Sequence, residues 1–288
     1  MSTFSANSGI GYEMAKYFAK KGAYVFLCSR TISKGEMAKS KINQEAPHAR
    51  IDVIPLDLSD ALSIDSMVNI IKQKTDRIDI LCNNAGIMGA KYTLTKDGFE
   101  SQMGVNHLGH FRLTGQLLDM MNDQSRIVNV SSMAYLQGRI NQKNFMFEHG
   151  QYSPFASYSR SKLANVLFTL ALSNRIQQSH LDIKVVCAHP GIAFTNLFSK
   201  EKQSNLFASL IMLFKKIVPT AADGAKAIIA ACMDPNANQG DFYGPYRSKK
   251  YQGDIIKLEK LNAIAANPQN QAFLWEYSTK KTGVNYPV

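Results

Sequence analysis

The sequence predicts an α/β fold in which one doubly wound parallel sheet carries helices on both faces. Short apolar runs alternate with amphipathic helical stretches along most of the 288 residues, which is the rhythm of repeated strand–helix–strand units. The strand-like runs are apolar almost throughout, as is typical of parallel strands buried on both faces. No stretch has the composition of a linker. We therefore expect one domain over residues 1–288, built on a Rossmann-like sheet.

The predicted elements begin with a helix whose apolar stripe runs from Met14 to Ala19 and which ends at Gly22. The strands that follow are expected at residues 24–28, 51–56, 78–82, 126–130 and 183–187. The helices between them are expected at residues 33–46, 60–74 and 99–121 and around Tyr158. Residues 193–219 break this alternation with a crowded apolar segment. That segment is either a helix that covers the core or a lid over an apolar substrate pocket that also touches a membrane.

The first strand is short in the sequence. A central parallel strand should supply five or six residues before the turn that opens the first helix, and only Met1 to Phe4 are present. Two explanations remain open: the sequence begins at an internal methionine of a longer protein, or the chain folds with its first strand truncated. In the second case the neighbouring strands lose ladder partners, which weakens the sheet.

The composition is that of a soluble globular protein, with 45% hydrophobic and 19% charged residues. A formal net charge of +11 suits an anionic ligand, such as a phosphorylated cofactor or an acidic membrane surface. The basic residues are dispersed, so we expect no nucleic-acid partner. The four cysteines are widely spaced, which indicates a reducing compartment, and the histidines form no group typical of a metal site. Without a visible signal peptide or spanning segment, the expected location is cytoplasmic.

The most informative stretch is Tyr158-Ser-Arg-Ser-Lys162, which places a phenol and an ammonium group four residues apart in a predicted helix. Residues at that spacing share a helix face. A cation beside a tyrosine lowers the pKa of the phenol, which can then exchange a proton with an alcohol or a carbonyl. The spacing alone is common, and its weight comes from other motifs that follow predicted strands. These are Ser8-Gly-Ile-Gly11, Asn83-Asn-Ala-Gly86, Asn129-Val-Ser-Ser132 and Pro190-Gly191.

In this order the motifs resemble the short-chain dehydrogenase/reductase family, and the resemblance runs from about residue 5 to the C-terminus. Three further stretches are similar to the branch that holds retinol dehydrogenases and WW-domain oxidoreductases: Tyr158–Phe168, Val105–Phe111 and Leu274–Gly283. The resemblance implies an NAD(P)-binding domain that interconverts an alcohol and a carbonyl on a lipophilic substrate of retinoid, steroid or fatty-aldehyde type. It also allows a homodimer and a peripheral contact with a membrane.

The resemblance further implies a dinucleotide site at the carboxyl edge of the sheet. Glycines let the backbone approach a pyrophosphate at a helix N-terminus. The residues that take this role here are Asn7, Ser8, Gly9, Ile10 and Gly11. The family pattern Thr-Gly-x-x-x-Gly-x-Gly is broken, because Phe4 and Ser5 stand at its first two positions. A serine forced to a positive φ at that turn would strain it by roughly 1 to 2 kcal/mol.

The remaining cofactor contacts are also carried over from the family. Asp57 and Leu58 match the residues that hold the adenine, Asn84, Ala85 and Gly86 those that pack the adenosine ribose, and Pro190, Gly191 and Thr195 those that fix the nicotinamide amide. Arg30 follows the second predicted strand with no acid beside it. A cation at that place favours the extra phosphate of NADP over NAD.

Four catalytic roles follow from the resemblance. Tyr158 exchanges a proton with the substrate oxygen, and Lys162 lowers the pKa of Tyr158 and binds the nicotinamide ribose. Ser132 hydrogen-bonds the same substrate oxygen, and Asn106 holds a water that links Lys162 to solvent. No metal is expected. Two alternatives stay open: a catalytically silent nucleotide-binding scaffold, which the broken glycine pattern permits, and a double-bond reductase resembling protochlorophyllide reductase.

Overall fold

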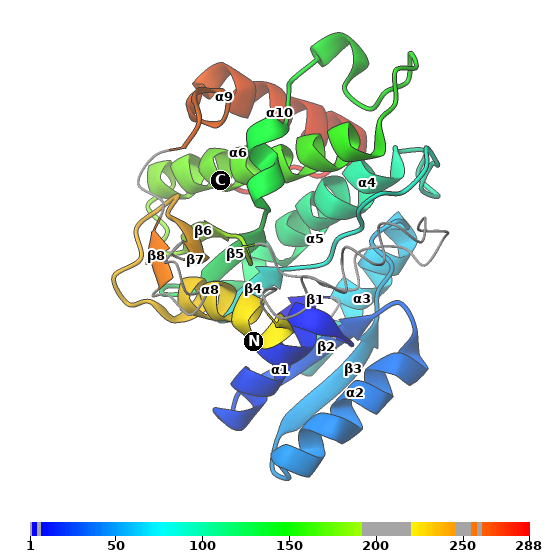
Figure 1. The fold of residues 1–288 in the computed structure, drawn as a ribbon. Coiled ribbons are helices and arrows are strands. Elements are labelled where there is room, and N and C mark those ends of the chain that lie inside the picture. Colours follow the sequence, from blue (N-terminus) through cyan, green and yellow to red (C-terminus); the bar gives the residue numbers. More distant parts are fainter. Residues whose placement is uncertain (1, 5–6, 192–219, 246–254, 258–260) are drawn as a thin grey trace.

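The computed structural model describes residues 2–4, 7–191, 220–245, 255–257 and 261–288 (Figure 1). Its strands form one eight-stranded sheet in the order β3-β2-β1-β4-β5-β6-β7-β8. They are β1 (Ser2–Phe4), β2 (Tyr24–Ser29), β3 (Arg50–Pro55), β4 (Ile80–Asn83), β5 (Arg126–Val130), β6 (Lys184–Ala188), β7 (Phe242–Pro245) and β8 (Ile255–Lys257). Neighbouring strands are parallel up to β7, and β8 pairs with β7 antiparallel. The predicted doubly wound α/β fold is confirmed, with an antiparallel edge strand that the sequence did not indicate.

Helices cover both faces of the sheet. On one face α1 (Gly9–Lys20), α2 (Ile32–Glu45) and α8 (Ala221–Met233) contribute to one hydrophobic cluster, and on the other α3 (Ala61–Lys74), α5 (Gly109–Leu117) and α6 (Pro154–Gln178) contribute to a second. The shorter elements are α4 (Ser101–Met103), the π-helix η1 (Gly104–Leu108), the 3₁₀ turns η2 (Leu118–Met120), η3 (Met133–Gln137) and η4 (Gln142–Asn144), and α9 (Ala263–Ala266). The stretch 99–121, predicted as one helix, is therefore four consecutive elements.

Strand β1 lies at the centre of the sheet. Ser2 and Thr3 pair with both β2 and β4, whereas Phe4 pairs with β2 alone, so two residues bridge the two halves of the sheet. The strand is thus shorter than the five or six residues expected for this position. Ser5 lies outside the described residues, as do the segment 193–219 and Thr195.

The C-terminal helix α10 (Pro268–Thr282) packs on the outer side of α6 and against α5 (Figure 1). The side chain of Asn267 caps its start, and Gly283, with a φ of +70°, ends it. Trp275 lies edge-on to Phe111 of α5, and the guanidinium of Arg175 lies 3.9 Å from the Trp275 ring centre. Because α10 covers it, α6 is buried along most of its 25 residues rather than on a single stripe.

Candidate active site

The segments predicted to form the site meet at the carboxyl edge of the sheet. Each begins within two residues of the end of its strand: Arg30 after β2, Asp57 after β3, Asn84 after β4, Ser131 after β5 and Pro190 after β6. The strand order reverses between β1 and β4, and connections leave that point in opposite directions. Ligands of doubly wound sheets bind in the crevice that this reversal opens.

Tyr158 and Lys162 lie one turn apart on α6, and both side chains are almost fully buried. The Lys162 Nζ atom is 5.8 Å from the centre of the Tyr158 ring. Nζ donates a hydrogen bond to the carbonyl of Val130 at the end of β5 (3.1 Å). The hydroxyl of Ser131 in turn donates to the main-chain carbonyl of Lys162 (2.8 Å). These two bonds tie α6 to the end of β5 and place the pair at the edge of the sheet.

Burial governs the protonation of both groups. It raises the pKa of Tyr158, an effect that the side chain of Ser132 partly offsets, and it lowers the pKa of Lys162 to about 8. From the sequence we expected Lys162 to lower the pKa of Tyr158, but in this structure desolvation of the phenol is the larger effect. Tyr158 is therefore held as a neutral phenol, the form that can donate a proton to a carbonyl oxygen.

Ser132 lies directly after Ser131 and forms the start of η3. Its hydroxyl oxygen accepts a hydrogen bond from the N–H of Ala134 (3.2 Å). This bond fixes the side chain at the N-terminus of the 3₁₀ turn, next to Tyr158. One hydroxyl and one phenol are thus brought to the same place from β5 and α6, as two partners of a single oxygen atom would need to be.

Asn106 lies in the π-helix η1 and joins two parts of the site. Its amide oxygen accepts the N–H of Ile87 (2.7 Å), and its amide nitrogen donates to the carbonyl of Ile87 (2.9 Å) and to the hydroxyl of Ser161 (2.9 Å). The side chain therefore joins the loop after β4 to α6 with both of its amide N–H groups in use. The main-chain carbonyl of Asn106 accepts a hydrogen bond from Nδ1 of His110 (3.1 Å), and its second lone pair is the acceptor that a water could use.

At two positions of the predicted site the surroundings leave little room for a side chain larger than that of glycine. A Cβ atom on Gly86 would lie 3.2 Å from Oδ1 of Asn106 and 3.3 Å from Nζ of Lys162, so the loop after β4 approaches both groups closely. Gly191 has a φ of +73°, and a Cβ atom there would lie 2.6 Å from Cγ of Pro245. Its N–H donates to Nδ1 of His189 (3.0 Å), which fixes the turn after β6.

A groove of about 480 Å³ opens beside this loop. Among its lining residues are six of the predicted cofactor contacts: Asn7, Arg30, Asp57, Leu58, Ala85 and Gly86. The carboxylate of Asp57 is fixed at the groove, because its Oδ1 accepts the N–H of Ser59 (3.0 Å) and the hydroxyl of Ser59 (2.6 Å). Gly9, with a φ of +59°, is the first residue of α1 and follows the N-cap residue Ser8. The cofactor residues and the catalytic residues therefore share one edge of the molecule.

Comparison with known proteins places the chain in a family. Residues 4–206 match the short chain dehydrogenase family. The chain belongs to the short-chain dehydrogenase family. It is 36% identical to retinol dehydrogenase 12 of Homo sapiens over 283 residues, which cover 98% of this chain and 85% of that protein. It is 41% identical to retinol dehydrogenase 13 of Homo sapiens over 194 residues, covering 67% of this chain and 58% of that protein.

A solved structure supports the same assignment. The crystal structure of an uncharacterized protein from Mycobacterium paratuberculosis is 33% identical, covers all of this chain and 94% of its own, and superposes with a TM-score of 0.81. Membership of the family makes this short-chain dehydrogenase an oxidoreductase that uses NAD or NADP. None of the helices among its described residues is both long enough and apolar enough to cross a membrane.

The residues that line the groove fit the phosphates of a dinucleotide. Two basic residues line it in addition to Arg30, which was predicted from the sequence. Lys34 and Lys96 also line the groove. Lys96 is paired with Asp60, whereas Lys34 lies in the first turn of α2 and is exposed. Thr31 makes no side-chain cap at this helix end, and the first turn carries no acid, so the helix dipole favours an anion there. Lys34 could have been found from its spacing of four residues from Arg30.

Proposed function

We propose that this short-chain dehydrogenase interconverts an alcohol and a carbonyl on a lipophilic substrate, with NADP as its cofactor. The observation that carries the proposal is the buried pair of Tyr158 and Lys162, with Ser132 beside the phenol, at the edge of the sheet where the groove opens. A structural role alone does not explain the pair, because burying an amine with a pKa of about 8 costs stability.

In the reducing direction, Tyr158 donates its phenolic proton to the carbonyl oxygen while the hydroxyl of Ser132 hydrogen-bonds the same atom. NADPH, when bound, supplies the hydride for the carbonyl carbon. Lys162 uses one of its N–H groups on Val130, which leaves donors for a ribose hydroxyl and for the phenolate that Tyr158 becomes. In the oxidising direction Tyr158 has to be the phenolate, which accepts the proton of the alcohol as the hydride leaves the carbinol carbon for the oxidised cofactor.

The preference for NADP is supported by the charges at the end of β2. Arg30 and Lys34 line the groove, and no acid that would accept the ribose hydroxyls of NAD follows the strand. Both side chains are exposed and reach the groove next to the uncapped start of α2. A phosphate there would meet two cations and a helix N-terminus together.

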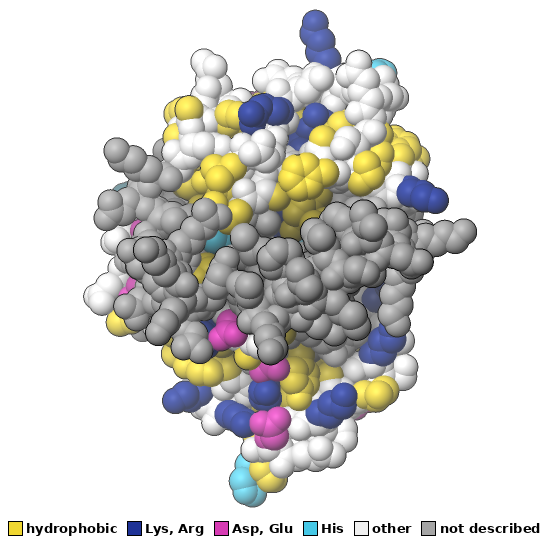
Figure 2. Space-filling model, viewed as in Figure 1, with side chains coloured by type: hydrophobic (Ala, Val, Ile, Leu, Met, Phe, Trp, Pro, Cys, Tyr) yellow, Lys and Arg dark blue, Asp and Glu magenta, His cyan; other side chains and the backbone are white. Residues whose placement is uncertain are grey.

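Apolar side chains near the catalytic residues support a lipophilic substrate. Leu136 in η3 and Phe155 at the start of α6 are 38% and 57% exposed, and they belong to the two segments that carry Ser132 and Tyr158. Figure 2 shows groups of apolar side chains on the face in view, with lysines and arginines dispersed between them. Two relatives are named retinol dehydrogenases, which supports a retinoid as one member of the expected range of retinoid, steroid or fatty-aldehyde substrates.

The remaining expectations are proposals of the same kind. One continuous sheet supports treating residues 1–288 as a single domain. A homodimer built from helices would need a surface other than the outer side of α6, because α10 covers it. The predicted lid and its contact with a membrane fall in residues 193–219, which lie outside the described residues, and the cytoplasmic location, with association to a membrane, stays an expectation from the sequence.

The test is turnover by the purified protein, with NADPH or NADH and a panel of carbonyl compounds. The panel holds retinal, a steroid ketone, a long-chain aldehyde and a short hydrophilic aldehyde, and the nicotinamide absorbance is followed. We expect reduction of the apolar carbonyls with NADPH. Binding of NADPH without turnover of any compound would instead support a silent scaffold. Reduction of a conjugated double bond with the carbonyl intact would support a double-bond reductase.

A further inference from the structure

The C-terminal helix α10 contacts the π-helix that carries Asn106. Nε2 of His107 lies 2.7 Å from the hydroxyl oxygen of Ser278, and neither side chain is accessible to solvent. The two residues are 171 positions apart in the sequence. Ser278 belongs to the stretch Leu274–Gly283, which marked the resemblance to a branch of the family and has no part in the mechanism proposed above.

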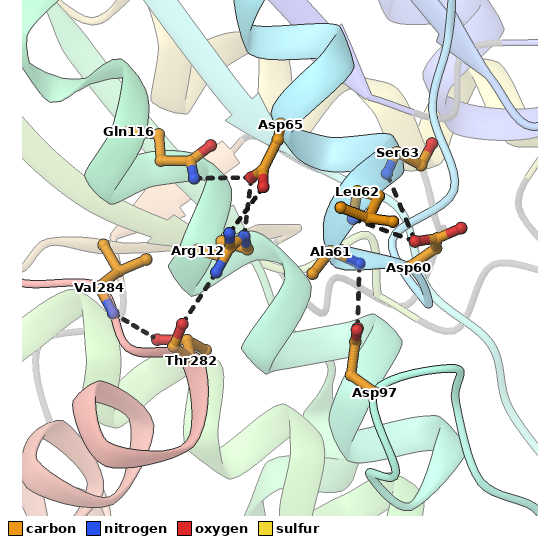
Figure 3. A network of polar contacts seen from close by, with 10 residues as sticks. All are labelled: Asp60, Ala61, Leu62, Ser63, Asp65, Asp97, Arg112, Gln116, Thr282 and Val284. Atoms are coloured by element: carbon orange, nitrogen blue, oxygen red, sulfur yellow. Dashed lines mark hydrogen bonds and ion pairs between the residues drawn. The ribbon is translucent and has the colours of Figure 1, made fainter.

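The position of Ser278 is well defined, because contacts with other helices hold α10 on both sides of this residue. Nη1 of Arg112 donates to the carbonyl of Thr282 (2.9 Å), and its Nε and Nη2 bind the two oxygens of Asp65 (2.9 and 2.8 Å). Figure 3 shows Arg112 between the end of α10 and the acid on α3. Toward the N-terminus of α10, Trp275 is held by Arg175 of α6. The helix therefore connects α3, α5 and α6 and cannot turn freely about its axis.

The helix η1 is a π-helix, a rare conformation that occurs frequently at functional sites. Two imidazoles hold it. The Nδ1–H of His110 donates to the carbonyl of Asn106, and His107 reaches Ser278. The His107 ring also lies against Phe168, with the ring centres 5.7 Å apart. Burial lowers the pKa of His107 to about 3 and that of His110 to about 4, so both rings stay neutral and keep these bonds over the working pH range.

We propose that His107 and Ser278 are positioning residues of the reaction. Their hydrogen bond fixes η1 and so holds the Asn106 amide between Ile87 and Ser161. The loop at Gly86 lies within about van der Waals distance of both this amide and Nζ of Lys162, so a displaced amide also loosens the surroundings of the lysine. This inference rests on the proposed function, since it gives α10 a part in the same catalytic site.

The experiment compares Ser278→Ala with Thr279→Val. Both remove one hydroxyl from α10, but among the described residues the buried hydroxyl of Thr279 has no hydrogen-bond partner. We expect Ser278→Ala to lower kcat about tenfold, because a misplacement of about 1 Å can cost up to about 100-fold and this one acts on the site indirectly. The KM for NADPH stays near that of the control, because the groove that holds the phosphates is lined by other residues. The pH profile of kcat is displaced, because Lys162 gains water and its pKa returns toward the ordinary value.

Two further variants separate positioning from folding. His107→Phe keeps the aromatic contacts and removes the hydrogen bond, so its kcat should match that of Ser278→Ala, and the double variant should show no additional loss. Ser278→Thr keeps the hydroxyl and should retain activity. If Ser278→Ala does not fold, His107→Gln, which keeps a side-chain donor near the position of Nε2, replaces it and should retain at least half of the wild-type kcat.

The inference is overturned if Ser278→Ala keeps at least half of the wild-type kcat with an unchanged pH profile, or if Thr279→Val loses as much. It is also overturned if the effects of His107→Phe and Ser278→Ala multiply in the double variant. Tyr158→Phe in the same assay tests the proposed function separately. If that variant is inactive while Ser278→Ala is normal, only the role of α10 is wrong.

Discussion

The substitution Arg30→Asp should move the cofactor preference from NADPH toward NADH. Arg30 stands directly after β2, lines the groove and is exposed. A charge-assisted hydrogen bond to a phosphate contributes about 1.5 to 3 kcal/mol, which corresponds to roughly a 10- to 160-fold loss in affinity for NADPH. The new carboxylate also repels the phosphate and can accept the ribose hydroxyls of NADH, so the ratio of the two kcat/KM values should change by more than either effect alone.

Lys34 limits the size of this effect, because it remains in the first turn of α2 beside the same groove. The assay is kcat/KM for both cofactors, measured at low and at high salt, since contacts of exposed charges weaken with ionic strength. The matched control is Lys41→Asp, which makes the same charge change at an exposed position of α2 that does not line the groove. A wild type that prefers NADH, or a control that shifts the ratio as much as Arg30→Asp, would refute the reasoning.

Three other substitutions test the electrostatics and the packing. Lys162 binds its proton less tightly when folded, so its burial penalty is full below pH 8 and disappears as the pH rises toward 10.5. Lys162→Met should therefore raise the free energy of unfolding in urea at pH 7 by roughly 3 kcal/mol, and a less stable variant at that pH would contradict this. His107 and His110 bind a proton less readily in the folded protein than in the unfolded chain. Their effect on the free energy of unfolding is therefore nil above pH 6.5, and they lower this free energy as the pH falls toward 4. His110→Gln should reduce the difference between urea midpoints at pH 7 and pH 5, and an unchanged difference would count against the assignment. Arg160→Met leaves three main-chain carbonyls between residues 139 and 145 without their donor, and should lower the free energy of unfolding by roughly 2 to 3 kcal/mol; a loss below about 0.5 kcal/mol would show that water replaces it.

Much of the fold could be predicted because its strands are short, apolar and bounded by turn residues. The strand predicted at 126–130 is β5 as observed, and Gly22 ends the first helix with a φ of +81°. The carboxyl edge could be predicted for the same reason, since a parallel sheet brings the ends of its strands together. Asp57, Gly86 and Arg30 line one groove, and their grouping was expected from their places after the strands together with the resemblance to the family.

The π-helix could not be predicted, because it changes the helical ladder by one residue and leaves the apolar periodicity of 99–121 almost intact. The packing of α10 was missed for a different reason. Two of the three buried residues of α10 are polar, Gln271 and Ser278, so Leu274 is the single apolar residue among them and no apolar stripe marks the buried side. The pKa of Tyr158 was expected to fall because the sequence shows which charges are near but not how deeply a phenol is buried.

The central claim is that Tyr158 transfers the proton while the cofactor groove works independently of it. Tyr158→Phe removes the phenolic hydroxyl and leaves the ring that packs near Lys162. Positioned acid–base catalysis contributes on the order of 10² to 10⁴-fold, so kcat with NADPH and the best carbonyl substrate should fall by about 100-fold or more. The dissociation constant for NADPH, measured on the same preparation, should change by less than about threefold, under 1 kcal/mol. A variant that keeps more than about a tenth of the wild-type kcat would contradict the claim.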